Sequence, residues 1–147
     1  MFSYRDYFLD LDPTYKDQWG MPLTRITFDW EPNERNFAAY VAPKLKELIQ
    51  ATGAKQVSAR GELPAHYDTV PYQSTHNTGG TIMGSDPSTS VVNNYLQMWD
   101  FNNVFVIGAC NFPQNGGFNP TGTVGALSYR AADGIVNKYR KNPGPLA

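Results

Sequence analysis

The chain has 147 residues, and its 12 Lys and Arg against 13 Asp and Glu give a formal net charge of −1 at pH 7. This length suits one compact domain. No stretch concentrates charge of one sign, so a nucleic-acid partner is not expected. No window approaches the ~20 apolar residues of a membrane span, and residues 1–10 lack the pattern of a secretory signal. These features predict a soluble chain without an address signal.

The residue types also exclude several kinds of site. Cys110 is the only cysteine, so an intramolecular disulfide is excluded. His66 and His76 follow no zinc-binding spacing, and no metal site is expected. Without a GxSxG motif there is no sign of a hydrolase, and Cys110 is expected to be buried and inert. The aromatic share of 14%, with 13 Gly and 11 Pro, favours a loop-rich α+β fold.

The first regular elements are expected before residue 55. Residues 23–30 alternate apolar and polar side chains, which predicts a strand. Asn33 is then a candidate N-cap for a helix that Gly53 ends. Pro43 falls inside this helix and predicts either a kink or two abutting helices. The apolar positions of the helix, at spacings of 4, 4 and 3, are Phe37, Val41, Leu45 and Leu48.

A long loop follows. Residues 55–60 predict a short strand, whereas residues 61–84 are rich in Pro, Thr, Ser and Gly and predict a structured loop. Long loops are uncommon in compact domains unless they bind something. His76 lies inside this loop among small residues and is therefore a candidate functional residue. A lone histidine is more often structural, so this segment leaves both interpretations open.

The second half of the chain predicts two short strands and a helix. One strand is expected within residues 90–99. Residues 104–107, Val-Phe-Val-Ile, predict a strand buried on both faces that Gly108 stops. After a loop over residues 111–120, a helix is expected from Thr121 to about Arg140. Its apolar stripe consists of Val124, Leu127, Ala131 and Ile135.

The start of this last helix has unusual residues. Gly122 and Gly125 lie in its first turns, and each lowers helix stability by up to ~1 kcal/mol relative to Ala. Two glycines here indicate the close approach of another backbone or of a planar ligand. The exposed amides of a helix start also attract negative charge. Asn119, just before them, can be an N-cap or a ligand-binding residue.

Together these segments resemble the carboxy-terminal domain of the glucose-methanol-choline (GMC) family of flavoprotein oxidoreductases. The family pattern is a His-containing loop followed by Gly-Thr and Met-Gly, a strand, and a His or Asn that opens a helix. Upstream, residues 15–22 and 25–30 are similar to the branch that includes gluconate, 2-ketogluconate, fructose and sorbitol dehydrogenase flavoprotein subunits. The matching parts, in order, are His76, Gly80-Thr81, Met83-Gly84, residues 104–107, Asn119-Pro120 and residues 127–135.

The resemblance implies a fold and a domain organisation. Residues 1–147 would form the family's α+β substrate-binding domain, with an antiparallel or mixed sheet. Residues 1–103 would be its substrate-domain part, and residues 104–147 a strand, loop and helix that pack against the FAD-binding domain. That dinucleotide-binding domain, with its GxGxxG motif, is missing from this chain, so we expect a fragment that by itself binds FAD weakly or not at all. The apolar face of the last helix would then lack its partner layer.

The resemblance also implies a reaction. A substrate alcohol would lose a hydride to flavin N5 while His76 takes the hydroxyl proton and Asn119 orients the substrate oxygen. The helix start would stabilise negative charge on the reduced flavin. Family members carry Asp-Ala where this chain has Gly108-Ala109, so a backbone contact is expected there without a carboxylate. The residues implied to contact FAD are Gly108, Ala109, Asn119, Pro120 and Thr121.

The implied partners are the amino-terminal FAD-binding region, a sugar, polyol or sugar-acid substrate, and small and cytochrome c subunits. The implied location is the periplasm, attached to the membrane through those subunits. Two alternatives stay open: a non-catalytic binding module of the same fold, and an oxidase that uses oxygen. The presence of both His76 and Asn119 favours an enzyme.

Overall fold

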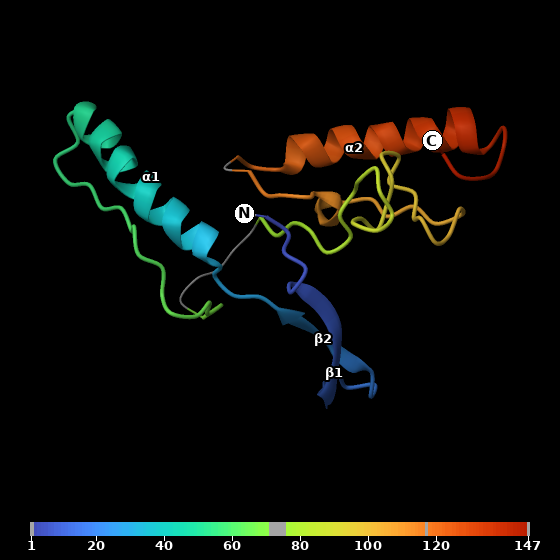
Figure 1. The fold of residues 1–147 in the computed structure, drawn as a ribbon, viewed down its shortest axis with the longest axis horizontal. Coiled ribbons are helices and arrows are strands. Elements are labelled where there is room, and N and C mark those ends of the chain that lie inside the picture. The colour runs from blue at the N-terminus through green and yellow to red at the C-terminus, as the bar shows by residue number, and fades with distance from the viewer. Residues whose placement is uncertain (1, 71–75, 117, 147) are drawn as a thin grey trace. The chain divides into compact units, whose positions relative to one another are not determined.

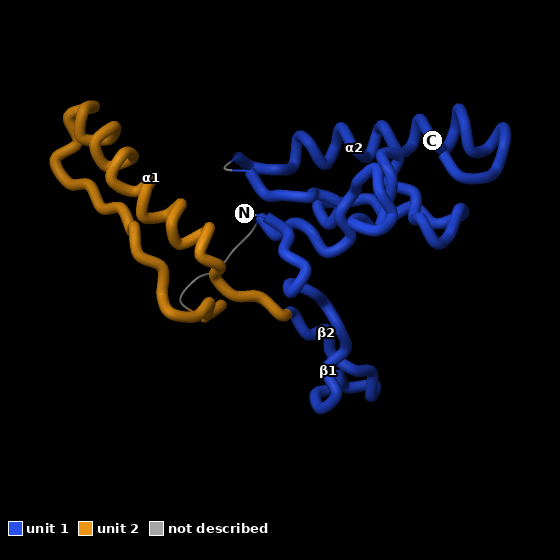
Figure 2. The backbone as a smooth tube through the Cα atoms, in the orientation of Figure 1, with its two compact units in different colours: residues 1–26, 74–147 blue, residues 27–73 orange. Residues whose placement is uncertain are grey.

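The computed structural model describes residues 2–70, 76–116 and 118–146. Its elements are strands β1 (Phe8–Lys16) and β2 (Pro22–Thr27), helix α1 (Pro32–Ala51), the 3-10 turn η1 (Ala109–Asn111), helix α2 (Thr121–Gly134) and its π-helical extension η2 (Ile135–Tyr139) (Figure 1). The predicted α+β composition is confirmed. The chain forms two compact units, residues 1–26 with 74–147 and residues 27–73 (Figure 2).

Strands β1 and β2 form the sheet of the described chain, a two-stranded hairpin. The carboxylate of Asp17 closes the turn by accepting the N–H groups of Trp19 and Met21 at 2.9 Å. Across the strands, the Arg25 Nε donates to Asp10 at 2.8 Å. The sequence predicted β2 to continue to residue 30, but it ends at Thr27. Asp29 accepts the Trp30 N–H at 2.7 Å, a local bond that competes with a strand ladder.

Helix α1 dominates the second unit. It begins at Pro32 after Glu31, so the predicted N-cap at Asn33 is wrong. Proline suits the first helical position because its missing N–H has no partner there. The helix runs unbroken through Pro43, which excludes two abutting helices. Gly53, with φ of +85°, follows the helix end as predicted.

The segment after α1 is held by side chains. Residues 55–60 form no strand, contrary to the prediction, because no other described segment pairs with them. Gly61 instead lies against α1, where an added Cβ would be 3.5 Å from the Ala42 Cβ. The Arg35 guanidinium spans successive carbonyls nearby. It donates to Leu63, Pro64 and Ala65 at 3.3, 2.9 and 2.7 Å.

An aspartate organises the two ends of this second unit. Asp29 accepts hydrogen bonds from the His66 Nδ1 at 2.6 Å and from the Tyr67 N–H at 2.9 Å, besides Trp30. The His66 bond and these backbone donors lower the pKa of Asp29 to about 2. The rings of Phe28, Trp30 and Tyr67 pack edge to face around it, with centroids 4.9 to 5.6 Å apart.

The first unit has a small core under α2. Val92, Leu96 and Ala131 are fully buried. The predicted stripe of the last helix is confirmed, since Leu127 and Ala131 face this core and α2 with η2 runs to Tyr139. The expectation that this apolar face lacks a partner is wrong, because residues 91–98 of the same chain cover it. The half-buried residues around the core are Met83, Val91, Met98, Val106 and Leu127.

Both strands predicted beneath α2 are absent. Among the described residues, one isolated bridge joins residues 90–99 to residues 104–107, and it pairs Gln97 with Phe105. Val104 and Ile107 are 37% and 46% exposed, so residues 104–107 are not buried on both faces. A tight turn replaces the ladder: Leu96 adopts a φ of 61°, and its N–H donates to the Asn93 carbonyl at 3.0 Å.

Two buried amides fasten residues 144–146 to this turn. The Asn93 Nδ2 donates to the Leu146 carbonyl at 2.7 Å, and the Gln97 Oε1 accepts the Leu146 N–H at 2.7 Å. The Gln97 Nε2 donates to the carbonyls of Asn102 and Gly144 at 2.6 and 2.9 Å. Because both side chains are buried, each of these bonds satisfies a group that water cannot reach.

Among the described helices, none has the length and apolarity to cross a membrane.

Candidate active site

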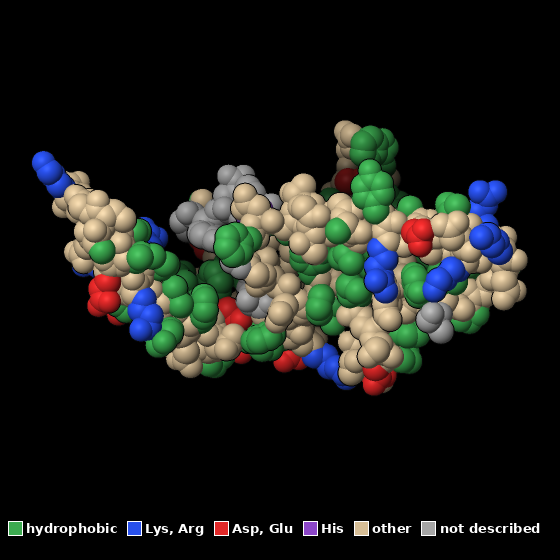
Figure 3. All heavy atoms as spheres, turned by 90° about the horizontal axis from the view of Figure 1, so that it is seen from above, with side chains coloured by type: hydrophobic (Ala, Val, Ile, Leu, Met, Phe, Trp, Pro, Cys, Tyr) green, Lys and Arg blue, Asp and Glu red, His purple; other side chains and the backbone are tan. Residues whose placement is uncertain are grey.

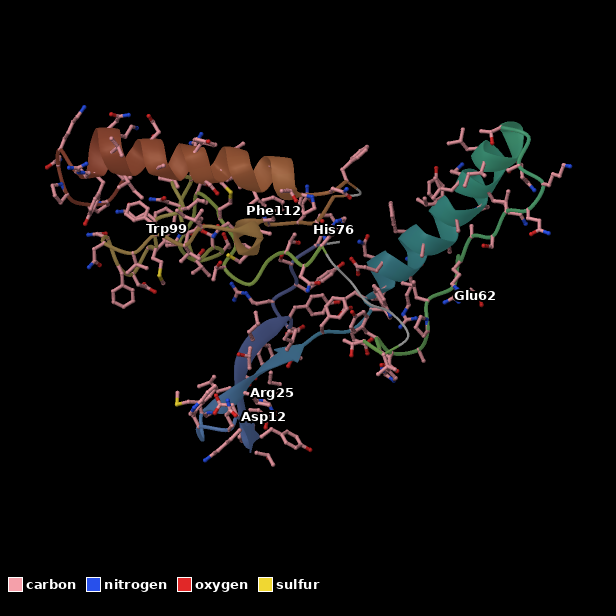
Figure 4. All side chains as sticks on the ribbon, turned by 180° about the vertical axis from the view of Figure 1, so that it is seen from behind. Asp12, Arg25, Glu62, His76, Trp99 and Phe112 are labelled. Carbon is pink, nitrogen blue, oxygen red and sulfur yellow. The ribbon has the colours of Figure 1, made fainter. Side chains whose placement is uncertain are left out.

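The loop that carries His76 turns sharply just after it. His76 is exposed, and Figure 4 shows it near Phe112 in the first unit. Gly79 and Gly80 have φ values of +85° and +104°, a conformation that favours glycine. A Cβ on Gly80 would also lie 3.1 Å from the Leu9 side chain. Glycine at these positions therefore lets the chain reverse beside His76.

The His76 loop is hydrogen-bonded to the turn η1. The N–H groups of alternate residues donate to carbonyls of successive residues in η1, since an extended segment runs beside a tight turn. The pairs are Gly79 to Ala109 at 3.1 Å, Thr81 to Cys110 at 3.0 Å and Met83 to Asn111 at 2.8 Å. These bonds join the two segments from which the sequence predicted catalytic and cofactor contacts.

Two asparagines that the sequence interpretation did not single out complete this junction. Asn111 is fully buried, and its Nδ2 donates to the Thr81 carbonyl at 3.1 Å while its Oδ1 accepts the Gly108 N–H at 3.1 Å. The Asn115 Nδ2 donates to the His76 carbonyl at 2.8 Å. Their position in a Gly/Pro/Asn loop was visible in the sequence, but their partners lie 30 and 39 residues away.

Helix α2 begins ten residues after η1 (121 minus 111) in the same unit. Its N-cap is Pro120, so the interpretation of Asn119 as the N-cap is wrong. Asn119 is exposed, and no side chain caps the helix. The first amides of α2, from Thr121 onward, consequently lack the capping acceptor that helix starts often have. Such a helix start is suited to a negatively charged or polar ligand.

The glycines of this region leave room. A Cβ added to Gly122 or Gly125 would meet no heavy atom of the described chain within 4 Å. Among the described residues, no backbone from another segment approaches these two glycines. At the other segment, the Gly108 N–H is already donated to Asn111. A backbone donor to a cofactor there would have to come from Ala109.

The structure thus brings the predicted segments together without pairing the two predicted catalytic side chains. Asn115 holds the His76 main chain and lies four positions before Asn119 in the sequence (119 minus 115). In the described residues, no hydrogen bond joins the His76 and Asn119 side chains. Cys110, expected to be buried, is half-buried in η1. No cluster of three His, Cys, Asp or Glu that could bind a metal occurs in the described part of the chain.

Comparison with known proteins identifies the family. The family model for GMC oxidoreductase matches residues 7–128, which include His76, Gly108, Ala109 and Asn119. The chain belongs to the GMC oxidoreductase family. The resemblance inferred from the His76 and Asn119 segments is confirmed.

Individual relatives of this GMC oxidoreductase chain are dehydrogenases. The gluconate 2-dehydrogenase flavoprotein of Pantoea cypripedii is 51% identical over 145 residues, 98% of this chain and 24% of that protein. The 2-methyl-1,2-propanediol dehydrogenase of Mycolicibacterium austroafricanum is 36% identical over 88% of this chain and 22% of its own length. The fructose dehydrogenase large subunit of Gluconobacter japonicus is 35% identical over 90% and 23%. The chain spans about a quarter of the length of these curated relatives.

Proposed function

We propose that this chain is the catalytic segment of an FAD-dependent dehydrogenase that oxidises a hydroxyl group of a sugar, sugar acid or polyol. The observation that carries the proposal is the hydrogen-bonded junction between the His76 loop and η1, in the same unit as the uncapped start of α2. The exposed imidazole of His76 and the exposed amide of Asn119 lie in this unit.

His76 is the base in this proposal. Oxidation of an alcohol to a carbonyl compound requires removal of the hydroxyl proton as the hydride leaves carbon. Imidazole is a common general base because the ordinary pKa of histidine, ~6.5, lies near physiological pH. General-base assistance of this kind contributes roughly 10²- to 10⁴-fold in rate. Asn119 cannot accept the proton, so it orients the substrate oxygen by donating a hydrogen bond.

The start of α2 fits the cofactor. When bound, FAD supplies the acceptor for the two electrons that leave the substrate. After Pro120, the amides from Thr121 onward have no side-chain cap, and the open side of Gly122 leaves space for a flat ring system. These amides and the aligned helix dipole stabilise negative charge. Ala109, in the turn bonded to the His76 loop, is the backbone contact that we assign to the cofactor on the other side.

The relatives favour a dehydrogenase over the two alternatives. The three relatives between 35% and 51% identical are named dehydrogenases, whereas a C-glycoside 3-oxidase of Arthrobacter globiformis is 30% identical. A non-catalytic binding module would have no need of an exposed imidazole at the junction. We therefore propose that the electrons pass from the flavin to an acceptor other than oxygen.

The exposed apolar side chains of the chain indicate protein partners. Hydrophobic side chains form patches on the face that Figure 3 shows, and the exposed fractions of Trp19, Ile26 and Phe37 are 78%, 71% and 65%. Such surface is normally covered by other protein. We propose that an amino-terminal FAD-binding region of the same polypeptide covers part of it, that residues 104–147 pack against that region, and that small and cytochrome c subunits attach the enzyme to a periplasmic membrane surface.

The test uses a chimeric flavoprotein, in which this chain replaces the 145 aligned residues of the Pantoea gluconate 2-dehydrogenase flavoprotein. Purified protein is mixed without oxygen with gluconate, fructose or sorbitol, and flavin bleaching is followed by absorbance. At least one substrate should bleach the flavin, and His76→Ala should slow bleaching by roughly 10²- to 10⁴-fold. His66→Ala is the matched control because its imidazole lies in the other unit. Equal rates for His76→Ala and the control contradict the base assignment.

Oxygen uptake measured in parallel separates the dehydrogenase from the oxidase. The proposal expects rapid reoxidation of the reduced chimeric flavoprotein by a quinone or dye and slow reoxidation by oxygen. Oxygen uptake as fast as dye reduction would identify an oxidase.

A further inference from the structure

The main chain at His76 is held by one side chain from the opposite segment. The Asn115 Nδ2 donates to the His76 carbonyl at 2.8 Å, whereas the backbone bonds between the two segments start three residues later, at Gly79. Among the described residues, His76 itself therefore lies beyond the last backbone bond of the junction. Without Asn115, the glycine-rich turn at Gly79 and Gly80 would be free to move the residue.

Asn111 fixes the start of the segment that leads to Asn115. Its buried amide bonds both to Thr81 in the His76 loop and to the Gly108 N–H in its own turn. A buried amide that lost these partners would be unsatisfied, which destabilises the fold. This requirement keeps residues 108–111 and 79–83 in one register. The segment that leads to Asn115 thus starts from a rigid point.

We propose that Asn115 is a positioning residue for the reaction. It holds the His76 main chain so that the imidazole faces the substrate hydroxyl, and it does so without touching the substrate. This inference rests on the proposed role of His76 as the base. Small displacements of a catalytic group lower rates steeply, and a shift of about 1 Å can lower them roughly 10²-fold.

The chemistry of the contact explains why the residue is asparagine. The partner is a carbonyl oxygen, so the side chain must donate a hydrogen bond. Aspartate has the same shape but cannot donate when ionised, and its charge would face the carbonyl. Glutamine keeps the donor on a longer side chain. The order expected for the reaction rate is therefore asparagine, then glutamine, then alanine and aspartate.

The experiment compares Asn115→Ala, Asn115→Asp and Asn115→Gln in the chimeric flavoprotein. The rate of anaerobic flavin reduction at saturating substrate should fall roughly 10- to 100-fold for alanine and aspartate and be partly restored by glutamine. Flavin content, read from absorbance, should not change. Asn137→Ala is the matched control, because it also removes an asparagine hydrogen bond, to Asp133 on α2, and it should react at the parent rate.

Amide hydrogen exchange supplies a readout that does not depend on catalysis. Peptides that cover residues 76–83 should exchange faster in Asn115→Ala than in the control. A rate for Asn115→Ala equal to that of Asn137→Ala overturns the inference even if exchange is faster, and it leaves the role of His76 in place. An unaffected His76→Ala overturns the proposed function and the inference with it.

Discussion

The two units of this chain keep irregular backbone in place by different means. In the first unit, buried amides and backbone bonds connect residues far apart in the sequence, such as Asn93 with Leu146 and Asn111 with Thr81. In the second, one long helix and the guanidinium of Arg35 hold a single extended segment, and large side chains such as Phe37 stay exposed. In the unit that bears the candidate active site, buried amide side chains bond to the main chain of distant residues.

This difference shows how a chain can position a site almost without a sheet. A strand ladder fixes register through many repeated bonds, whereas each buried amide fixes one point and tolerates no substitute. The first unit should therefore depend strongly on a few side chains. The second should tolerate the loss of any one of its exposed contacts.

The largest effect is expected from Gln97→Ala. The substitution removes the acceptor for the Leu146 N–H and the donor to Gly144 and Asn102, and it leaves a cavity. The local free energy of unfolding should fall by about 3 kcal/mol, which corresponds to roughly 100-fold faster amide exchange in residues 91–98. Exchange is measured by mass spectrometry of the chimeric flavoprotein. Gln50→Ala, on exposed helix surface, is the control, and equal exchange in the two variants would show that the amide is dispensable.

A smaller effect is expected from Arg35→Lys in the second unit. A single ammonium cannot span the three carbonyls that the guanidinium reaches. Stability of the segment should fall by about 1 kcal/mol, so that limited proteolysis within residues 61–70 becomes roughly fivefold faster. Flavin reduction should be unchanged, as in the control Lys44→Arg. A loss of flavin reduction in Arg35→Lys would contradict the expectation that contacts within the second unit do not affect the reaction.

The smallest effect is expected on the stability of the second unit at acid pH. The folded-state pKa of Asp29 is about 2, below the ordinary value of 3.8, so its ionised form stabilises the second unit above about pH 4. That contribution is lost as the pH falls towards 2. Pepsin should therefore cleave Asp29→Asn faster than the parent at pH 4, with the difference shrinking towards pH 2.

The control for the acid experiment is Asp68→Asn, which also replaces a carboxylate by an amide, at a site whose oxygen accepts a local bond from the Val70 N–H. Cleavage is compared between variants at each pH, so that the pH dependence of pepsin itself cancels. A ratio of cleavage rates that stays constant from pH 4 to pH 2 would show that the Asp29 carboxylate contributes no acid-sensitive stability.

The sequence predicted best what depends on local pattern. The stripe of α2, with Leu127 and Ala131, follows helical spacing and could be found without tertiary information. The loop with His76 was recognised from its glycines and its resemblance to a family. Residues 104–107 were misjudged because an apolar run predicts burial but not a partner strand. Their neighbours form a turn at Leu96, which a short apolar run cannot reveal.

For the same reason, the sequence could not predict which residues of the candidate site bond to each other. The bonds of Asn111 and Asn115 cross 30 and 39 positions of sequence, and an asparagine in a loop looks alike whether it is buried or solvated. Asn119 was a candidate N-cap from its position alone, and the structure moved the cap to Pro120. Side-chain amides that act at a distance have no periodic signal to detect.

The bond from Asn115 to His76 also bears on how the protein ages. Asn115 is followed by Gly116, where even an added Cβ would meet open space. The Gly116 nitrogen can attack the Asn115 side-chain carbonyl carbon to form a succinimide, with release of ammonia, and hydrolysis then leaves aspartate or isoaspartate. Neither product can donate to the His76 carbonyl when ionised. Deamidation during storage would therefore remove the same hydrogen bond as the Asn115→Asp substitution, without any change in the gene.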